Sequence, residues 1–311
     1  MEYSILILTI CKMASLMGVG IWLSYKLSFT QDVRKFMIFV IMNIAIPALI
    51  LNGFFQVTID QNLITQMMFV FIYSFIFNFV ILFLGWIISK GFGFESRKAG
   101  ESAFLSTFCN AGLIGIPLCV AIFGPKGAVL AAVFDAGMHF SLWTLGIFML
   151  QENKVFTLKS LRSMITTPFI SILIGIAITL IGITPHLFIR DLMSTVGGAA
   201  SPLAMFYIGM LIMTLIQNKH KVSMKLISVP ISLKLIVFPI AGMMFLPFLP
   251  FHMEVKQQLV VMMALPALTI TSVIMAHHNA DENYGVIHTL LTTVISLVTI
   301  PLILLLGDIV L

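Results

Sequence analysis

Residues 110–118 read NAGLIGIPL, and residues 264–272 read ALPALTITS. Each segment lies inside a long apolar run and contains one proline, Pro117 or Pro266. Proline lacks an amide hydrogen and its ring clashes with the carbonyl four residues earlier, so both runs are predicted to be interrupted helices. Glycines such as Gly112 remove side-chain bulk, which lets the backbone bend or approach another helix.

Backbone groups freed inside a membrane must be satisfied by protein, water or a ligand. Two interrupted helices in corresponding places of two halves indicate the substrate site of a transporter, and the helix N-termini at the breaks attract anions. The alternative is a pair of kinks that serves packing alone. On the first interpretation the substrate-binding residues are Asn110, Gly112, Gly115, Pro117, Pro266, Thr269, Thr271 and Ser272.

The composition places these segments in a membrane. Of the 311 residues, 60% are hydrophobic and 9% are charged, against about 45–50% and about 25% in a soluble domain. A single soluble core cannot hide so much apolar surface. A soluble enzyme, a disordered chain and a nucleic-acid-binding protein are therefore excluded, and an all-α polytopic membrane protein remains.

Apolar runs of the length that spans a bilayer, about 20 residues, recur along the chain. Polar clusters separate ten candidate spans, at 4–24, 36–55, 63–89, 102–123, 128–150, 166–184, 196–216, 228–249, 258–278 and 284–306. The connections are too short for a soluble domain or a nucleotide-binding loop, which excludes an ATP-driven pump within this chain.

Basic residues alternate between the connections, and this bias predicts the orientation. The connections after the first, third, fifth and seventh spans hold Lys26, Arg34, Lys35, Lys90, Arg97, Lys98, Lys154, Lys159, Arg162, Lys219, Lys221 and Lys225. Those on the other side hold only Lys126, Arg190 and Lys256. We therefore expect a multi-pass protein of the plasma membrane with both termini outside the cytoplasm.

Ten spans divide into two sets of five, and an odd number inverts the second set relative to the first. The segments Ile46–Leu51 and Ser201–Phe206 each carry proline at the second position, and the fourth and ninth spans each carry a proline within the span. The chain is thus predicted to hold two inverted five-helix repeats, residues 1–155 and 156–311. The alternative is that prolines are simply common in membrane helices.

The pattern from Asn110 through Gly115-Ile-Pro-Leu resembles a motif of the auxin efflux carrier family, which includes plant PIN-type auxin exporters and bacterial permeases for malate or malonate. The ninth-span segment with Asp281 beyond it, and the region Thr167–Gly209, are similar to the family as well. The resemblance therefore covers nearly the whole chain. The long central loop of the plant exporters is absent, so their loop-based regulation does not carry over.

The resemblance implies a fold like that of the bile acid–sodium symporters, in which spans four and nine cross at the substrate site. Spans one, two, six and seven would form a scaffold. Spans three to five and eight to ten would form a transport unit that moves in an elevator-like way. The resemblance also implies a homodimer in some members.

Ionisable residues at span depth are costly and therefore indicate function. Asp135 and His139 lie four residues apart on the fifth span and share a helix face. They are either a proton-linked pair or a structural hydrogen-bonded pair. Lys234, in the eighth span, balances an anionic substrate, pairs with a carboxylate, or extends toward the cytoplasmic surface.

No metal site or cofactor is predicted. Cys11, Cys109 and Cys119 lie in apolar runs without metal-ligand spacing, which favours buried thiols. The predicted crossing offers hydroxyls and a freed carbonyl but no carboxylate for sodium, so we expect transport without sodium dependence.

The leading prediction is a secondary carrier for small organic anions such as malate or malonate, with protons and the lipid bilayer as further partners. The alternatives are a weak-acid exporter of the auxin type driven by membrane potential, and a channel or non-transporting receptor. An intramembrane enzyme is not expected, because aspartate-rich diphosphate motifs, a His-Glu-x-x-His motif and a protease dyad are all missing from the sequence.

Overall fold

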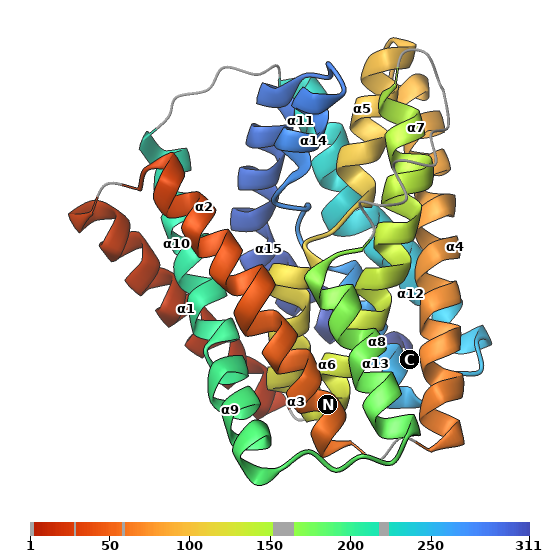
Figure 1. Ribbon diagram of the computed structural model, residues 1–311. Helices are drawn as coiled ribbons and strands as arrows, with labels where there is room; N and C mark the ends of the chain where they lie inside the picture. The colour runs from red at the N-terminus through yellow and green to blue at the C-terminus, as the bar shows by residue number, and fades with distance from the viewer. Residues whose placement is uncertain (1–2, 28, 58–59, 152–164, 218–223) are drawn as a thin grey trace. The chain divides into compact units, whose positions relative to one another are not determined.

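The computed structural model describes residues 3–27, 29–57, 60–151, 165–217 and 224–311. This part of the chain is helical apart from its connecting segments and one isolated antiparallel bridge (Figure 1). The predicted repeat boundary at residues 155 and 156 lies outside the described residues. So do the predicted cytoplasmic charges Lys154, Lys159, Arg162, Lys219 and Lys221.

The chain forms two compact units that interleave along the sequence. Unit 1 comprises Met1–Val70, Ala111–Asp135 and Ile165–Gln217. Unit 2 comprises Phe71–Asn110, Ala136–Met164 and Asn218–Leu311. Each unit is therefore assembled from segments that are distant in sequence.

Helices of unit 1 approach closely at small residues. Its elements are α1 (Tyr3–Lys26), α2 (Gln31–Val40), the π-helical turn η1 (Ile41–Ala45), α3 (Ile46–Gln56), the π-helical turn η2 (Ala111–Gly115), most of α6 (Ile116–Ser141), α8 (Thr167–Leu180), α9 (Leu187–Gly198) and α10 (Ala200–Gln217). The helix α1 lies along α10 (Figure 1), and a Cβ at Gly209 would overlap the carbonyl oxygen of Met17. Likewise α3 packs on α9, where Gly197 meets the backbone of Leu49. Such contacts suit a membrane, where packing rather than water drives helix association.

Unit 2 is organised around its last helix. Its elements are the greater part of α4 (Gln61–Gly91), α5 (Ser96–Thr107), the π-helical turn η3 (Leu142–Gly146), α7 (Ile147–Leu150), α11 (Met224–Ser232), the π-helical turn η5 (Leu233–Val237), α12 (Phe238–Phe245), the 3₁₀ turn η6 (Leu246–Phe248), α13 (Met253–Met263), α14 (Thr271–His277) and α15 (Glu282–Val310). The helix α15 packs against α5, α11, α13 and α14. It therefore supports both helical pieces of the ninth predicted span.

Within the described residues, six helical stretches are long and apolar enough to cross a membrane: Gln31–Gln56, Gln61–Gly91, Ala111–Leu150, Leu187–Met213, Leu226–Phe248 and Glu282–Val310. The third is interrupted at Gly124, whose φ of +68° is not helical, and Pro125 follows it. The sequence predicted the connection between the fourth and fifth spans at this place. The count of ten spans and the inverted relation of the halves stay predictions.

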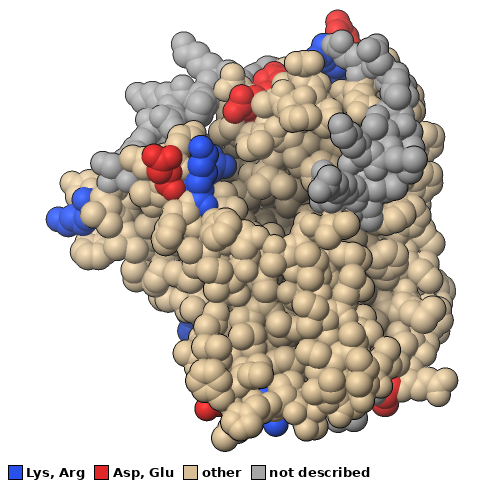
Figure 2. Space-filling model, viewed as in Figure 1, with Lys and Arg blue, Asp and Glu red and all other residues tan. Residues whose placement is uncertain are grey.

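The exterior is apolar. Large apolar side chains of α4 are exposed along its length: Met68, Phe69, Ile72, Ile76, Phe79, Phe83 and Ile87. On the face shown in Figure 2, few of the described side chains are charged. Exposed apolar surface of this extent is rare on a water-soluble monomer, and a helix that is apolar all round belongs in a core or a bilayer. The chain is a multi-pass membrane protein.

Candidate functional site

The first interrupted span breaks ahead of Pro117 rather than at it. The helix α5 ends at Thr107, residues 108–110 are not helical, and Pro117 directly follows the turn η2 and Ile116. In a π-helical turn each backbone carbonyl accepts from the amide five residues later instead of four. Such a turn accommodates a proline, which has no amide hydrogen to donate to the carbonyl four residues earlier. The predicted interruption is present, but its predicted position at Pro117 was wrong.

The second interrupted span breaks where the sequence predicted it. The helix α13 ends at Met263 and α14 begins at Thr271. Pro266 lies between them in a non-helical segment. This segment exposes backbone donors and acceptors that helices normally satisfy, so their partners decide whether it can lie in a membrane.

The two breaks satisfy each other. Cys109 and Ala267 form an antiparallel bridge. The amide of Asn110 donates to the carbonyl of Pro266 at 2.9 Å, and the amide of Leu268 donates to the carbonyl of Phe108 at 3.1 Å. Backbone groups freed in one span are thus used by the other, which explains why the first break lies at residues 108–110.

Two threonines of α15 brace the second break, and sequence reasoning missed both. The hydroxyl of Thr292 accepts from the Ala267 amide at 3.2 Å, and Thr289 donates to the Leu268 carbonyl at 3.4 Å. A signal was present in the sequence. Polar residues recur three or four positions apart on one buried face of this apolar helix, at His288 or Thr289, Thr292 or Thr293, and Ser296.

Side chains predicted to bind substrate meet at the bridge. Asn110 donates from its amide to the hydroxyl of Thr269, and both side chains are buried. Thr271 donates to the Leu268 carbonyl, and the buried Ser272 packs against Gly285 of α15. The structure therefore uses the hydroxyls of Thr269 and Thr271 for internal contacts.

Lys234 reaches the same place from a different helix. It lies on η5, its side chain is 3% exposed, and its ammonium donates to the carbonyl of Thr107 at 2.8 Å. Thr107 ends α5, and a helix C-terminus carries partial negative charge that favours a cation. Extension of Lys234 to the cytoplasmic surface is thus wrong. In the part of the chain that the structure describes, it forms no ion pair with a carboxylate.

The remaining predicted residues belong to η2 and α6. Gly112, Gly115 and Pro117 are buried. A Cβ at Gly112 would lie 3.9 Å from Oδ1 of Asp135. Asp135 and His139 are both buried, one turn apart on α6. Their burial fits either predicted role, a proton-linked pair or a structural one.

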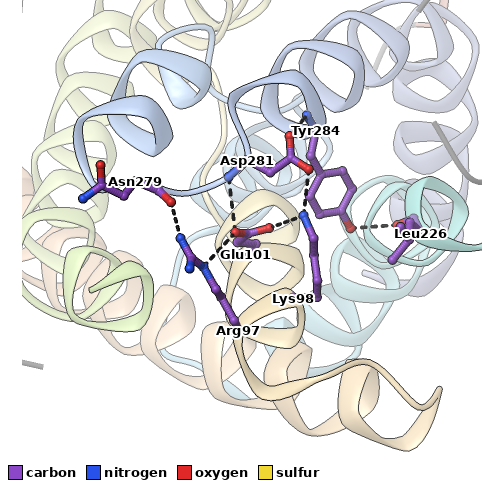
Figure 3. A network of polar contacts seen from close by, with 7 residues as sticks. All are labelled: Arg97, Lys98, Glu101, Leu226, Asn279, Asp281 and Tyr284. Carbon is purple, nitrogen blue, oxygen red and sulfur yellow. Dashed lines mark hydrogen bonds and ion pairs between the residues drawn. The ribbon is translucent and has the colours of Figure 1, made fainter. Parts of the chain in front are cut away.

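A second polar cluster, which we call the α5–α15 network, comprises Arg97, Lys98, Glu101, Asn279, Asp281, Tyr284 and Leu226 (Figure 3). The Lys98 ammonium lies 2.8 Å from Glu101 Oε2 and 2.8 Å from Asp281 Oδ2. Oε1 of Glu101 accepts from the Asp281 amide at 3.2 Å and lies 3.8 Å from Arg97 Nε.

The network also fixes the start of α15. Arg97 donates to the carbonyl of Asn279, a non-glycine residue at φ +54°. Asp281 caps α15 by accepting from the Tyr284 amide at 3.1 Å. The Tyr284 hydroxyl donates to the Leu226 carbonyl of α11 at 2.7 Å. The first turns of α5 and α11 and the connection between α14 and α15, which are far apart in sequence, therefore meet at one end of unit 2.

Contacts within the network shift the pKa values of Lys98 and Asp281 toward their charged forms. Burial raises the pKa of Asp281, but the Lys98 ammonium and the Tyr284 amide outweigh it and hold that pKa below its usual 3.8. Burial lowers the pKa of Lys98, but the hydrogen bonds to Asp281 and Glu101 outweigh it and raise that pKa above its usual 10.5. The network is a set of compensated charges.

The sequence pattern of a family described as membrane transport protein matches residues 5–304. The chain belongs to this family. The match covers nearly the whole chain and confirms the resemblance to the auxin efflux carriers. An uncharacterized transporter of Methanothermobacter thermautotrophicus is 23% identical over 267 residues, which cover 85% of each chain.

As a membrane transport protein, the chain falls in a class whose work is transport rather than catalysis. Within the described residues, no group of three or more His, Cys, Asp or Glu side chains could hold a metal ion. Cys109 and Cys119 are buried, but the expected burial of Cys11 was wrong, because that residue is exposed on α1.

Proposed function

We propose that this membrane transport protein is a secondary carrier for small organic anions of the malate or malonate type. The observation that carries the proposal is Lys234. A buried ammonium requires a counter-charge, and within the described residues its contact is a backbone carbonyl. An anionic substrate supplies the missing charge.

The surroundings of Lys234 support a binding site. Its partner Thr107 immediately precedes the first break, and Asn110 lies three residues further on. The Asn110 side chain can donate and accept hydrogen bonds, and its contact with Thr269 joins the two interrupted spans. A carboxylate that binds at Lys234 would therefore lie close to the two breaks, where both interrupted spans are non-helical.

Alternating access by an elevator-like movement fits this arrangement. Both sides of the paired break, together with Lys234, belong to unit 2. The backbone bonds and the α5–α15 network tie these parts together, so they would move as one body. We further propose a plasma-membrane protein with both termini outside the cytoplasm, able to form a homodimer, whose transport is linked to protons. The sequence suggests Asp135 and His139 as candidates for this coupling, a choice that substitution of each buried histidine can test.

The test is counterflow in proteoliposomes. Vesicles loaded with unlabelled malate should accumulate radiolabelled malate until internal malate is exhausted, and malonate should compete. Replacing sodium with choline should leave the rate unchanged. Conductance far above carrier turnover would establish a channel instead. Accumulation of indole-3-acetate, driven by an imposed potential and without malate counterflow, would establish the weak-acid exporter.

A further inference from the structure

His288 is a buried histidine that the proposed site does not yet use. It lies on α15 and its side chain is 0% exposed. Among the described residues, neither ring nitrogen has a hydrogen-bond partner. The Pro230 carbonyl of α11 approaches the ring without hydrogen-bonding geometry. Buried polar groups in membrane proteins are normally paired, so a buried imidazole without a partner is a candidate ligand-binding group.

The position of His288 links it to the paired break. It lies one turn before Thr292, whose hydroxyl donates to the His288 carbonyl at 2.8 Å and accepts from the Ala267 amide. The charge of Lys234 acts on its ring, because η5 and α15 pack together. The two side chains therefore approach the same region from two helices of unit 2.

Other charged groups lie on α15 and on the elements packed against it. Arg97, Lys98 and Glu101 of α5 belong to the network with Asp281, about two helical turns from His288 along α15. Among the side chains that the structure describes, the other charged groups and histidines are Glu254 and Lys256 in the first turn of α13, His277 at the end of α14, and Glu282 and Asp308 on α15 itself. Of the described charges, that of Lys234 is the one that acts on His288.

We propose that Lys234 and His288 together bind the two carboxylates of a dicarboxylate, and that His288 takes up one proton as the dianion binds. This inference rests on the proposed carrier function and adds the number of protons that bind with each substrate molecule, which is one. With the site empty, a second positive charge beside the Lys234 ammonium is unfavourable, so the imidazole stays neutral. A bound dianion reverses the balance, and a proton from water adds to the ring nitrogen. The ammonium and the imidazolium then balance the two negative charges.

The coupling has a thermodynamic signature that needs no gradient. When binding of one ligand takes up one proton, its affinity falls by about tenfold per pH unit above the pKa of the binding group. Imidazole is the side chain that titrates in the range from about pH 5 to 8. We expect the Kd of malate, measured by calorimetry on purified protein, to rise about tenfold per unit toward alkaline pH.

Three variants make the test specific. His288→Gln should bind malate with a Kd that is independent of pH, and it should keep malate counterflow. In separate runs with net uptake of malate into empty vesicles, pyranine inside the vesicles should report proton entry with the wild type and none with this variant. His252→Gln is the matched control, because His252 is an exposed residue before α13. It should behave as the wild type. His139→Gln tests the rival coupling group, and it should keep the wild-type pH dependence.

The outcomes separate the two proposals. If no carboxylate shows counterflow in the wild type, the carrier proposal is wrong. If counterflow is present but the wild-type Kd does not vary with pH, the role of His288 is wrong, whatever the variants do. If His139→Gln loses the pH dependence of the malate Kd and His288→Gln keeps it, then His139 of α6 is the residue that takes up the proton. Equal competition by propionate and malonate would contradict the binding of two carboxylates.

Discussion

The α5–α15 network and the Lys234 region are two polar clusters of unit 2. They differ in whether the buried charges have partners of opposite charge. In the network, Lys98 has two carboxylate partners and the buried Glu101 has two cations and a backbone amide. Lys234 is as buried as Glu101, and among the described residues its contact is one backbone carbonyl. Compensated charges stabilise one structure, whereas a buried charge without a counter-ion is costly to keep unless a ligand completes it. The contrast separates the structural cluster from the proposed binding site.

The largest expected effect belongs to Lys234→Met. A charge-assisted contact with substrate is worth about 3 kcal/mol, so its loss should lower malate counterflow by about a hundredfold. Thermal stability should be unchanged or higher, because the variant removes an uncompensated buried charge. The control is Lys12→Met, the same change at an exposed lysine of α1. Counterflow at the wild-type rate in Lys234→Met would remove the contrast between the clusters.

Asn110→Ala should reduce counterflow by about tenfold, the equivalent of about 1.4 kcal/mol for a lost hydrogen bond. The backbone bond from residue 110 to Pro266 remains, so the protein should fold. Asn78→Ala is the matched control, since Asn78 is an equally buried amide that donates to the Ser74 carbonyl one turn earlier on its own helix. Equal losses in both variants would mean that Asn110 acts through packing alone.

Glu101→Gln should affect stability rather than flux. It leaves Arg97 and Lys98 with less compensation, and we expect a loss of about 2 kcal/mol in unfolding free energy, with flux of the folded protein within about twofold of the wild type. Thermal unfolding followed by size-exclusion fluorescence measures the first and counterflow the second. Glu95→Gln is the control, because Glu95 is exposed and makes no capping bond. A large loss of flux without a loss of stability would place the network in the transport site.

The smallest expected effect is the pH dependence of the network. The pKa of Asp281 is lowered, so its contribution is present above the usual 3.8 and is lost as pH falls through the native value. The pKa of Lys98 is raised, so its contribution is present below 10.5 and is lost as pH rises through the native value. The melting temperature difference between the wild type and Asp281→Asn should therefore be constant from about pH 5 to 9. A difference that changes between pH 6 and 8 would show that a histidine controls the network.

Much of the site could be predicted because it depends on local chemistry. Pro266 cannot donate a hydrogen bond in any environment, so the second break follows from the residue itself. The first break does not follow from Pro117, because a π-helical turn absorbs that proline and the pairing with residues 266–268 positions the gap. The bracing by Thr289 and Thr292 was missed because a hydroxyl in an apolar helix does not reveal its partner.

The sequence by itself determined that this is a membrane protein, that two of its spans are interrupted, and that it belongs to the membrane transport protein family. These properties reside in side-chain polarity, in proline and in residue order, which act over a few positions. Tertiary structure alone decided that Lys234 meets Thr107 and that Asp281 meets Lys98, across more than 100 residues of chain. A lysine is the same residue in the sequence whether or not its charge has a partner. Only the fold determines which groups surround it.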